Sequence, residues 1–400
     1  MKYIVLLGDG MADYPCPELD NLTPLQYAQT PHMDSLAAHG ETGMVKTIPD
    51  GFPPSSDVAN LAVMGYAPEK YYTGRSPLEA ASMGVELAKE DVAWRCNLVT
   101  LSDEPAYAAK KMVDYSSGEI TSEEARKLIE AVQAALGTED KRFYPGISYR
   151  HLMVWHNGPE ETIVTPPHDI SGRVVGDYLP KGAGADALVE IMQQSYALLK
   201  EHSVNRFRVA KGLPPANAVW LWGQGKRPQL PLFKDLYHLD GAVVCAVDLI
   251  MGIGTCAGMR VLKVPGATGN IHTNFKGKAE AALAALRDGV DFVYVHVEAP
   301  DEAGHQGSTE LKVRAIEEID RQVLGVLLEG LTDFLDYRIM LLPDHPTPLS
   351  IRTHSAEPVP YVLLDNRITK ASGQTYSESS AAATGIMVPD GPSLMRKFLS

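Results

Sequence analysis

The chain has 400 residues, of which 45% are hydrophobic and 22% are charged. These values are close to the averages for globular proteins and exclude a disordered chain, and the length allows two domains or one domain with a large insertion. The formal net charge is −14 and no run of basic residues occurs, which argues against nucleic acid as a partner.

The cysteines and the apolar stretches indicate the compartment. Four cysteines lie far apart in the sequence: Cys16, Cys96, Cys245 and Cys256. They include no C-x-x-C pair, which argues against a zinc ribbon and a disulfide framework and favours a reducing compartment. The apolar run at 3–7 is too short for a signal peptide, and the apolar stretch at 241–259 contains Asp248 and four glycines. We therefore expect no membrane span and a cytoplasmic protein.

The first predicted elements are a short apolar strand at 3–7 and a helix after it. Thr30 as N-cap, Pro31 in the first turn and Gly40 at the end predict that helix. Residues 45–56 are rich in turn formers, and a new apolar segment begins at Asp57.

The pattern changes from about residue 89. Thr121 and Glu124 resemble a capping box ahead of a helix that runs to Leu136. The sequence then predicts hairpin-like strands at 149–156 and 161–165 and a helix at 184–200. Residues 211–231 are rich in Gly, Pro and Trp without a clear period, which predicts a linker or an ordered loop.

Apolar strands alternating with amphipathic helices return from about residue 236. The predicted elements are helix 277–288, strand 291–297, helix 309–329, strand 337–342 and a last strand at 359–364. This alternation predicts an α/β fold with a mostly parallel sheet.

Three predicted strands end in acidic or imidazole side chains: Asp9 after 3–7, Asp301 and His305 after 291–297, and Asp344 and His345 after 337–342. In open α/β sheets ligands bind at the carboxyl ends of the strands, so these side chains are expected to converge. His354 follows soon after the third set. Carboxylate and imidazole together suit Mn or Zn, with Mg or Co as further candidates, and two such sets can hold two metals.

A serine next to this edge is a candidate nucleophile. Ser55 and Ser56 precede Asp57 at the start of a predicted helix, where the helix dipole and a bound cation would stabilise an alkoxide. A plain serine N-cap explains the same residues equally well on local grounds.

Several motifs spread along the chain carry a family resemblance: LGDGMAD at 7–13, TPLQYAQTPHMD at 23–34, SDVANL at 56–61, GYAPEKYYTGRSPLEAA at 65–81, SYRH at 148–151, VPGATG at 264–269, APDEAGH at 299–305, PDHPTP at 343–348 and RTH at 352–354. With these motifs the chain resembles the archaeal type of cofactor-independent (2,3-bisphosphoglycerate-independent) phosphoglycerate mutase, within the alkaline phosphatase superfamily. The resemblance covers essentially the whole chain.

The resemblance implies an alkaline-phosphatase-like core, with a mostly parallel sheet between helices, at 1–88 and 236–400. It implies an inserted α+β lid domain that binds substrate at 89–235. One metal would be held by Asp301, His305 and His354, and the other by Asp9, Asp344 and His345. Ser56 would be both metal ligand and nucleophile, chosen over Ser55 because the family's nucleophile directly precedes an acid.

The implied reaction is the interconversion of 3-phosphoglycerate and 2-phosphoglycerate in glycolysis and gluconeogenesis, without 2,3-bisphosphoglycerate. Ser56 as a metal-bound alkoxide would take the phosphoryl group, and the reoriented glycerate would take it back through its other hydroxyl. A lid that excludes water is needed, since water would hydrolyse the phosphoserine.

The insert should supply the groups that bind carboxylate and phosphate, a task that suits the planar guanidinium of arginine. The candidates are Arg95, Arg150, Arg206 and Arg208. His168 and Asp169 are candidates for general acid and base toward the glycerate hydroxyls. From the core, Lys276 or Lys278 could contact the phosphoryl group, and the sequence does not separate the two.

Two other activities stay open. A bacterial branch with very similar motifs is proposed to act as homoserine kinases, whose pocket would need an acidic group for the substrate ammonium. The chain has no P-loop, because Gly225 and Lys226 are followed by Arg227, which modestly favours the mutase. A metal-dependent phosphomonoesterase is the third reading. The expected partner is a small phosphorylated molecule, and the sequence leaves the oligomeric state open, a homo-oligomer included.

Overall fold

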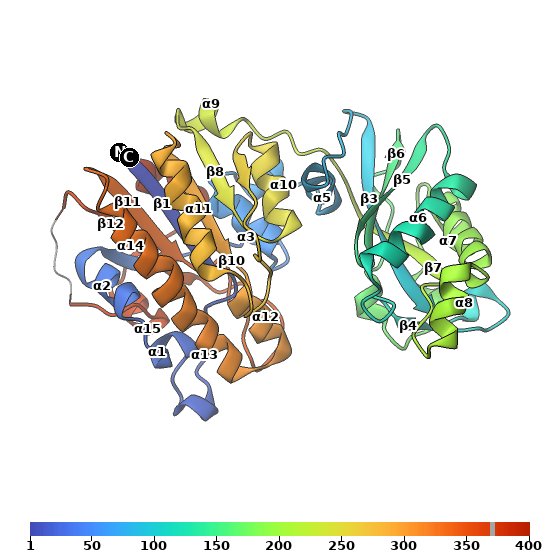
Figure 1. Ribbon diagram of the computed structural model, residues 1–400, viewed down its shortest axis with the longest axis horizontal. Helices are drawn as coiled ribbons and strands as arrows, with labels where there is room; N and C mark the ends of the chain where they lie inside the picture. The colour runs from blue at the N-terminus through green and yellow to red at the C-terminus, as the bar shows by residue number, and fades with distance from the viewer. Residues whose placement is uncertain (369–372) are drawn as a thin grey trace. The chain divides into compact units, whose positions relative to one another are not determined.

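The computed structural model describes residues 1–368 and 373–400, which fold into two compact units (Figure 1). The first unit, here called the core, is Met1–Tyr72 with Gln229–Ser400, and the second, the insert, is Thr73–Pro228. The sequence placed these divisions at 88/89 and 235/236. The role of the insert as a substrate-binding lid stays a prediction.

The core is built on an eight-stranded sheet in the order β13-β2-β12-β11-β1-β10-β8-β9. Its strands are β1 Lys2–Gly8, β2 Glu41–Val45, β8 Gly241–Val244, β9 Arg260–Leu262, β10 Phe292–Val297, β11 Tyr337–Leu342, β12 Val359–Asp365 and β13 Met387–Val388. From β9 to β11 all neighbours are parallel, and only β12 runs antiparallel to both of its neighbours. The predicted mostly parallel sheet is confirmed. β1 contains a continuous apolar run and β10 is largely apolar, as expected for strands buried on both faces.

Helices cover both faces of this sheet. They are α1 Pro24–Tyr27, α2 Pro31–His39, α3 Ser56–Val63, α4 Pro68–Tyr71, α9 Phe233–Tyr237, α10 Asp248–Cys256, α11 Phe275–Arg287, α12 Ala299–Gln306, α13 Thr309–Glu318, α14 Gly325–Leu331, α15 Glu378–Ala383 and α16 Gly391–Leu399. A π-helical segment, Ile319–Leu324, joins α13 to α14, and a short 3-10 helix spans Pro17–Leu19.

Alternate residues of each strand point to opposite faces, which decides what each face contacts. Ile4 and Leu6 of β1 pack in one large buried cluster with α2, α11, α13 and α14, the helices in front of the sheet in Figure 1. On the other face, Tyr3 contacts Phe398 of α16, and Tyr294 of β10 donates a hydrogen bond to Asn60 of α3. The second face of β10 is therefore the one that looks toward α3.

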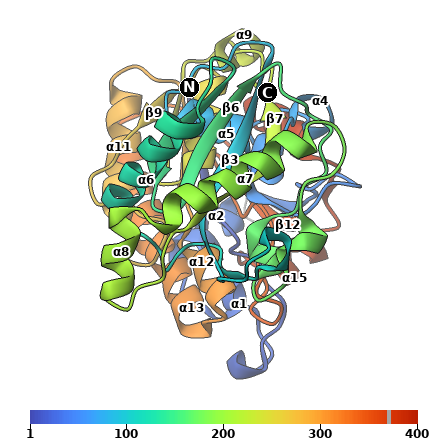
Figure 2. The same ribbon diagram turned by 90° about the vertical axis from the view of Figure 1, so that its right-hand side faces the viewer.

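The insert has an antiparallel sheet in which β3 pairs with β4, β6 and β7, and β5 pairs with β6. Its strands are β3 Asp91–Leu101, β4 Met112–Asp114, β5 Lys141–Ile147, β6 Arg150–His156 and β7 Ala218–Lys226. Its helices are α5 Ser76–Ser82, α6 Ser122–Leu136, α7 Ala185–Lys200 and α8 Ser203–Ala210, with 3-10 turns at Tyr107–Ala109, Pro167–Ile170 and Val175–Tyr178. Figure 2 shows α6 and α7 lying across the near face of this sheet. The predicted α+β insert is confirmed.

Two predictions for the insert are wrong. The strand Arg150–His156 pairs with Lys141–Ile147 before it, whereas Ile163 makes only an isolated bridge with Lys181. Pro145 and Gly146 conceal the earlier strand, because they lie at an irregularity between Tyr144 and Ile147.

The predicted loop at 211–231 contains strand β7. Its glycines and prolines cluster toward its ends, and the apolar residues between them pair along β3.

The segment after β10 is also more regular than predicted. Pro300 and Gly304, residues typical of turns, lie in helix α12 together with Asp301 and His305. Pro300 is in the first turn, where its missing N–H costs nothing, and Gly307 ends the helix with a φ of 66°. A Cβ on Gly304 would lie 2.6 Å from the carbonyl oxygen of Thr347, so glycine allows close packing there.

Candidate active site

The carboxyl ends of β1, β10 and β11 bring the predicted metal ligands together in the core. Asp9 follows β1, and Asp344 and His345 follow β11. Asp301 and His305 lie four residues apart on α12, so they share one face of that helix. Within residues 1–368 and 373–400, three groups of side chains lie close enough to bind one cation: Asp301, His305 and His354; Asp9, His296 and Asp344; and Asp9, Asp301 and His345.

Asp301, His305 and His354 form the first group. The Nε2 atoms of His305 and His354 each lie 3.3 Å from an oxygen of Asp301 and only 2.9 Å from each other. The other ring nitrogen of each histidine faces a carbonyl oxygen, that of Arg352 for His305 and that of Pro54 for His354. The hydrogen bond with Asp301 raises the pKa of His305 to about 9, so without a cation this ring carries a proton that the contact with Asp301 stabilises. A cation bound to Asp301, with Nδ1 of both histidines protonated, would replace that proton and take the two Nε2 lone pairs as ligands.

Asp9, Asp344 and His345, the ligand set predicted for the second metal, make up a second group, although two of the groups above combine these residues with His296 and with Asp301. The Nε2 of His345 lies 3.6 Å from Asp9 Oδ1 and 3.5 Å from Asp344 Oδ2. Asp344 Oδ1 accepts hydrogen bonds from the backbone N–H groups of Gly10 and His345, at 3.0 and 2.9 Å. These bonds hold Asp344 in place, and all three side chains of the group are essentially excluded from solvent.

His296 belongs to this group and was missed from the sequence. It is buried within β10, and its Nε2 lies 3.0 Å from Asp9 Oδ2. That contact lacks hydrogen-bond geometry, since neither ring nitrogen of His296 has a hydrogen-bond partner among the described residues, nor has Asp9 Oδ1. The sequence did contain a sign of its role, because a histidine inside an otherwise apolar strand is costly to bury unless it has a partner.

The electrostatics of the second group fit a bound cation. Burial, and then the charges of Asp344 and Asp301, hold the pKa of Asp9 well above its usual range. Burial lowers the pKa of His296 to about 3, so this ring is neutral and available as a donor. Crowded carboxylates, neutral imidazoles and unpaired buried donor atoms are what divalent cations bind, so the residues present fit two metal ions.

Ser56 lies at the first position of α3, with Ser55 as its N-cap residue. Its Oγ is 3.1 Å from Nε2 of His345, so the hydroxyl faces the second metal group. On the other side of that ring, His345 Nδ1 lies 3.3 Å from the hydroxyl oxygen of Thr347, which itself donates to Asp301. Thr347 therefore accepts the Nδ1 proton, and the Nε2 lone pair of His345 is directed toward Ser56.

Asn60 fixes α3 against the site. Its Nδ2 donates to the backbone carbonyl of Ser56 and to Asp344 Oδ2, both at 2.8 Å, and its Oδ1 accepts from Tyr294 at 2.7 Å. The alternative reading of Ser56 as a helix N-cap does not apply, because Ser55 occupies that position without a side-chain capping bond.

The two candidate lysines of the core differ sharply. Lys276 is exposed and pairs with Glu280. Lys278 is fully buried, and its Nζ donates to the backbone carbonyl of His296 at 2.9 Å. Burial lowers the pKa of Lys278 to about 8. Of the two, only Lys278 contacts the strand that carries the metal site.

Arg95, Arg150 and His168 of the insert are linked by a chain of aromatic contacts. The Arg95 guanidinium lies 4.4 Å from the Trp222 ring, and the His168 ring is 5.3 Å from the same indole. His168 is 6.0 Å from Tyr115, Tyr115 is 5.8 Å from Tyr149, and Arg150 lies over Tyr149 at 5.5 Å. Burial, the leading cause, lowers the pKa of His168, whose Nε2 is 3.7 Å from Asp169.

Arg206 and Arg208 on α8 are not part of this chain of contacts. Arg206 is exposed beside Glu201. Arg208 is buried, and its three nitrogens bond to the carbonyl of Pro214, to Glu124 and to the carbonyl of Ser117. The substrate-binding role of these two arginines stays a prediction.

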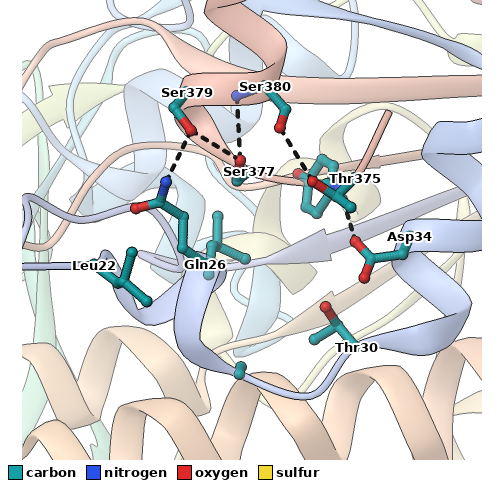
Figure 3. Close-up of a pocket in the computed structure, with 11 residues that line it drawn as sticks. Leu22, Gln26, Thr30, Asp34, Thr375, Ser377, Ser379 and Ser380 are labelled. Carbon is teal, nitrogen blue, oxygen red and sulfur yellow. Dashed lines mark hydrogen bonds between the residues drawn. The ribbon is translucent and has the colours of Figure 1, made fainter. Parts of the chain in front are cut away.

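A separate pocket of about 280 Å³ lies in the core between α1, the start of α2 and the segment 375–380 (Figure 3). It is lined largely by hydroxyl groups, with Gln26 and Asp34 beside them. Asp34 accepts a hydrogen bond from the backbone N–H of Tyr376 at 2.8 Å. None of the predicted site residues lines this pocket.

The fold and the site together define a class: an α/β protein with the donor set of a two-metal phosphoryl-transfer centre. The model of the family described as 2,3-bisphosphoglycerate-independent phosphoglycerate mutase matches residues 37–205. A probable enzyme of that name from Geobacter sulfurreducens is 54% identical over the full length of both chains. One from Methanothrix thermoacetophila is 49% identical, again over the full length of both. The chain therefore belongs to the 2,3-bisphosphoglycerate-independent phosphoglycerate mutase family.

Two solved structures show the same fold over the whole chain. A protein from Pyrococcus horikoshii matches with a TM-score of 0.83 and 29% identity, covering 100% of this chain and 96% of its own. The cofactor-independent phosphoglycerate mutase of Thermoplasma acidophilum matches with a TM-score of 0.66 and 26% identity, covering 100% and 99%. No helix among the described residues combines the length and the apolar character that crossing a bilayer would require.

Proposed function

We propose that this chain interconverts 3-phosphoglycerate and 2-phosphoglycerate through a phosphoserine at Ser56. Full-length relatives at about half identity carry the name of this enzyme, which supports the reaction. The observation that carries the proposal is the placement of one serine hydroxyl, 3.1 Å from His345 Nε2, beside two groups of metal-binding side chains. The name of the relatives also indicates that the reaction needs no 2,3-bisphosphoglycerate.

The residues proposed to hold two divalent ions are Asp301, His305 and His354 for one, and Asp9, Asp344, His345 and Ser56 for the other. Such ions neutralise charge on a transferring phosphoryl group and help to align it with its nucleophile. The mixed oxygen and nitrogen donors suit Mn or Zn, with Mg and Co as alternatives. His296, next to Asp9, is proposed to orient that carboxylate.

Ser56 Oγ is the proposed attacking atom. A bond forms between this oxygen and phosphorus while the bond from phosphorus to O3 of 3-phosphoglycerate breaks, which leaves a phosphoserine and glycerate. The O2 hydroxyl of the same glycerate then attacks phosphorus, and the bond to Ser56 breaks. The proton lost by each attacking hydroxyl is returned to the leaving oxygen, so nothing is consumed. His168 and Asp169 are the proposed acid and base for the glycerate hydroxyls.

The charge of the insert supports an anionic substrate. Burial is the largest cause of the fall in the pKa of Arg95 to about 10, and the nearby guanidinium groups of Arg75 and Arg150 contribute to it against the opposing charge of Glu79. Arg75 and Arg95 share the carboxylate of Glu79, and Arg150 adds a third guanidinium whose charge acts on Arg95. The excess positive charge suits the carboxylate of phosphoglycerate. It does not suit the ammonium group of homoserine, which would need an acidic partner. The proposed partner is therefore a small phosphorylated acid, and the proposed location is the cytoplasm, where four free cysteines are stable.

The test is a coupled assay that follows 2-phosphoglycerate formed from 3-phosphoglycerate, without ATP and without 2,3-bisphosphoglycerate. Protein treated with a chelator should be inactive and should regain activity when Mn or Zn is added. Ser56→Ala should abolish turnover, whereas Ser55→Ala, one residue away, should keep most of it. Metal-independent turnover, or an active Ser56→Ala variant, would contradict the proposal.

A further inference from the structure

Arg95 occupies an unusual position in the insert. It lies on β3 and is only 5% exposed. It pairs with Trp222 of β7 across the two strands, and its guanidinium lies over the Trp222 ring at 4.4 Å. Among the described residues its ion-pair partner is Glu79 of α5, whose Oε2 is 3.1 Å from Nε.

The hydrogen-bonding capacity of Arg95 is largely unused. The contact between Nε and Glu79 lacks hydrogen-bond geometry, so that buried nitrogen has no hydrogen-bond partner. Within the described part of the chain, its two terminal nitrogens have no recorded acceptor either. Leaving the buried N–H of Nε without an acceptor is costly, and the terminal nitrogens of a guanidinium carry four further N–H donors. An anionic ligand at this position would satisfy them.

Glu79 contacts the Nε side of the Arg95 guanidinium. Its Oε1 lies 3.1 Å from Nε of Arg75, and its Oε2 faces Arg95, so one carboxylate is shared by two arginines. The Glu79 side chain is only 12% exposed, which strengthens both contacts relative to a surface pair.

Trp222 restrains the other side of the guanidinium. Its indole N–H donates to Asn97 Oδ1 at 3.0 Å, and His168 packs against its ring. Arg95 is thus held between a carboxylate and an aromatic face, and its rotamer is fixed before any ligand binds. This arrangement is the one expected of a preorganised anion-binding arginine.

We propose that Glu79 is a positioning residue, which with Trp222 orients Arg95 so that its terminal nitrogens bind the carboxylate of the phosphoglycerate. This inference rests on the proposed function and assigns roles to residues that have no direct part in the chemistry. It makes an unusual prediction, because Glu79 is itself negative and would repel an anionic substrate if it acted by charge alone.

Glu79→Gln separates the two roles. If Glu79 only adds negative charge, its removal should strengthen the binding of the anion and lower KM. If it positions Arg95, its removal should raise KM by about 10- to 100-fold, the range expected when a charge-assisted hydrogen bond is lost. Because the interaction is with a part of the substrate that does not react, kcat should change much less. Glu86→Gln is the matched control, since Glu86 is exposed in the same unit.

Trp222→Phe is the second variant, and it keeps an aromatic ring while removing the hydrogen bond to Asn97. It should raise KM in the same direction by a smaller factor. Circular dichroism and thermal unfolding of each variant identify any loss of folding. Titration calorimetry with 3-phosphoglycerate, in the Ser56→Ala background that prevents turnover, measures binding directly and should weaken by the same factor as KM rises.

The outcomes are distinct. A folded Glu79→Gln variant with unchanged or lower KM and unchanged affinity would overturn the positioning role while leaving the mutase intact. A wild-type protein that neither turns over nor binds 3-phosphoglycerate would overturn the proposed function, and the inference with it. Weaker binding in Glu79→Gln, with Glu86→Gln like the wild type, is the result that the inference predicts.

Discussion

Replacing Lys312 by methionine should destabilise the core strongly. Lys312 lies on α13 and is completely buried. Its Nζ is 2.6 Å from Asp13 Oδ2, 2.8 Å from the carbonyl of Thr347 and 3.2 Å from the carbonyl of Ala12. These contacts join the segment after β1 to the segment after β11, and both segments carry proposed metal ligands.

The magnitude follows from what the substitution leaves behind. Asp13 is 1% exposed at its side chain and would keep only backbone donors, from Tyr14 and Leu349. Removing one partner of a buried ion pair costs about 3–5 kcal/mol. For a domain of about 150–250 residues, this corresponds to a fall in melting temperature of roughly 6–20 °C.

Chemical denaturation and differential scanning calorimetry measure this loss. Lys234→Met is the control, because Lys234 is 67% exposed and pairs with Asp240 at the surface of the same unit. That control should cost less than about 0.5 kcal/mol. Adding Asp13→Asn to Lys312→Met should recover part of the loss, since no buried charge is then left unpaired. A loss below about 1 kcal/mol for Lys312→Met alone would refute the reasoning.

Two further predictions concern the site and the pH dependence of stability. His296→Ala should weaken metal binding by about 10- to 100-fold, measured by competition with a chromogenic chelator, because His296 contacts Asp9 and orients it; unchanged affinity would contradict this. Hydrogen bonds from Arg367 have the largest effect on the pKa of Asp365 and hold it well below its ordinary value. Burial opposes this shift, and hydrogen bonds from Arg338 add to it. A depressed folded-state pKa gives stability that is complete above the unfolded value of about 3.9 and is lost as pH falls toward the folded one. The difference in free energy of unfolding between wild type and Asp365→Asn should therefore narrow below about pH 4. A difference that stays constant from pH 7 to about pH 2.5 would refute this prediction.

The sheet and its carboxyl edge were predictable because local signals and the fold agree there. β1 and β11 contain continuous apolar runs, and β10 is apolar apart from Tyr294 and His296, as expected for buried parallel strands. Polar side chains directly after such strands must then share one edge of the sheet, which is why Asp9, Asp301 and Asp344 could be grouped from the sequence.

The misses have physical reasons of the same kind. His296 lies inside a strand and faces α3, and its neighbour Asp9 is remote in the sequence, so the strand pattern concealed it. β7 was predicted as a loop because prolines flank it and Gly223 and Gly225 lie within it, although its pairing with β3 outweighs that composition. The partners of Arg208 are mainly backbone carbonyls, and no sequence pattern indicates such acceptors, so its burial could not be predicted.

The most direct test of the central claim is to look for the phosphoserine itself. Wild-type protein with Mn is mixed with 3-phosphoglycerate, quenched in acid within one turnover, digested and examined by mass spectrometry. The account predicts one phosphoryl group on the peptide that contains Ser55 and Ser56, assigned to Ser56 by fragmentation and absent from Ser56→Ala. Turnover of 3-phosphoglycerate with no phosphorylated peptide, or with the phosphoryl group on another residue, would contradict it.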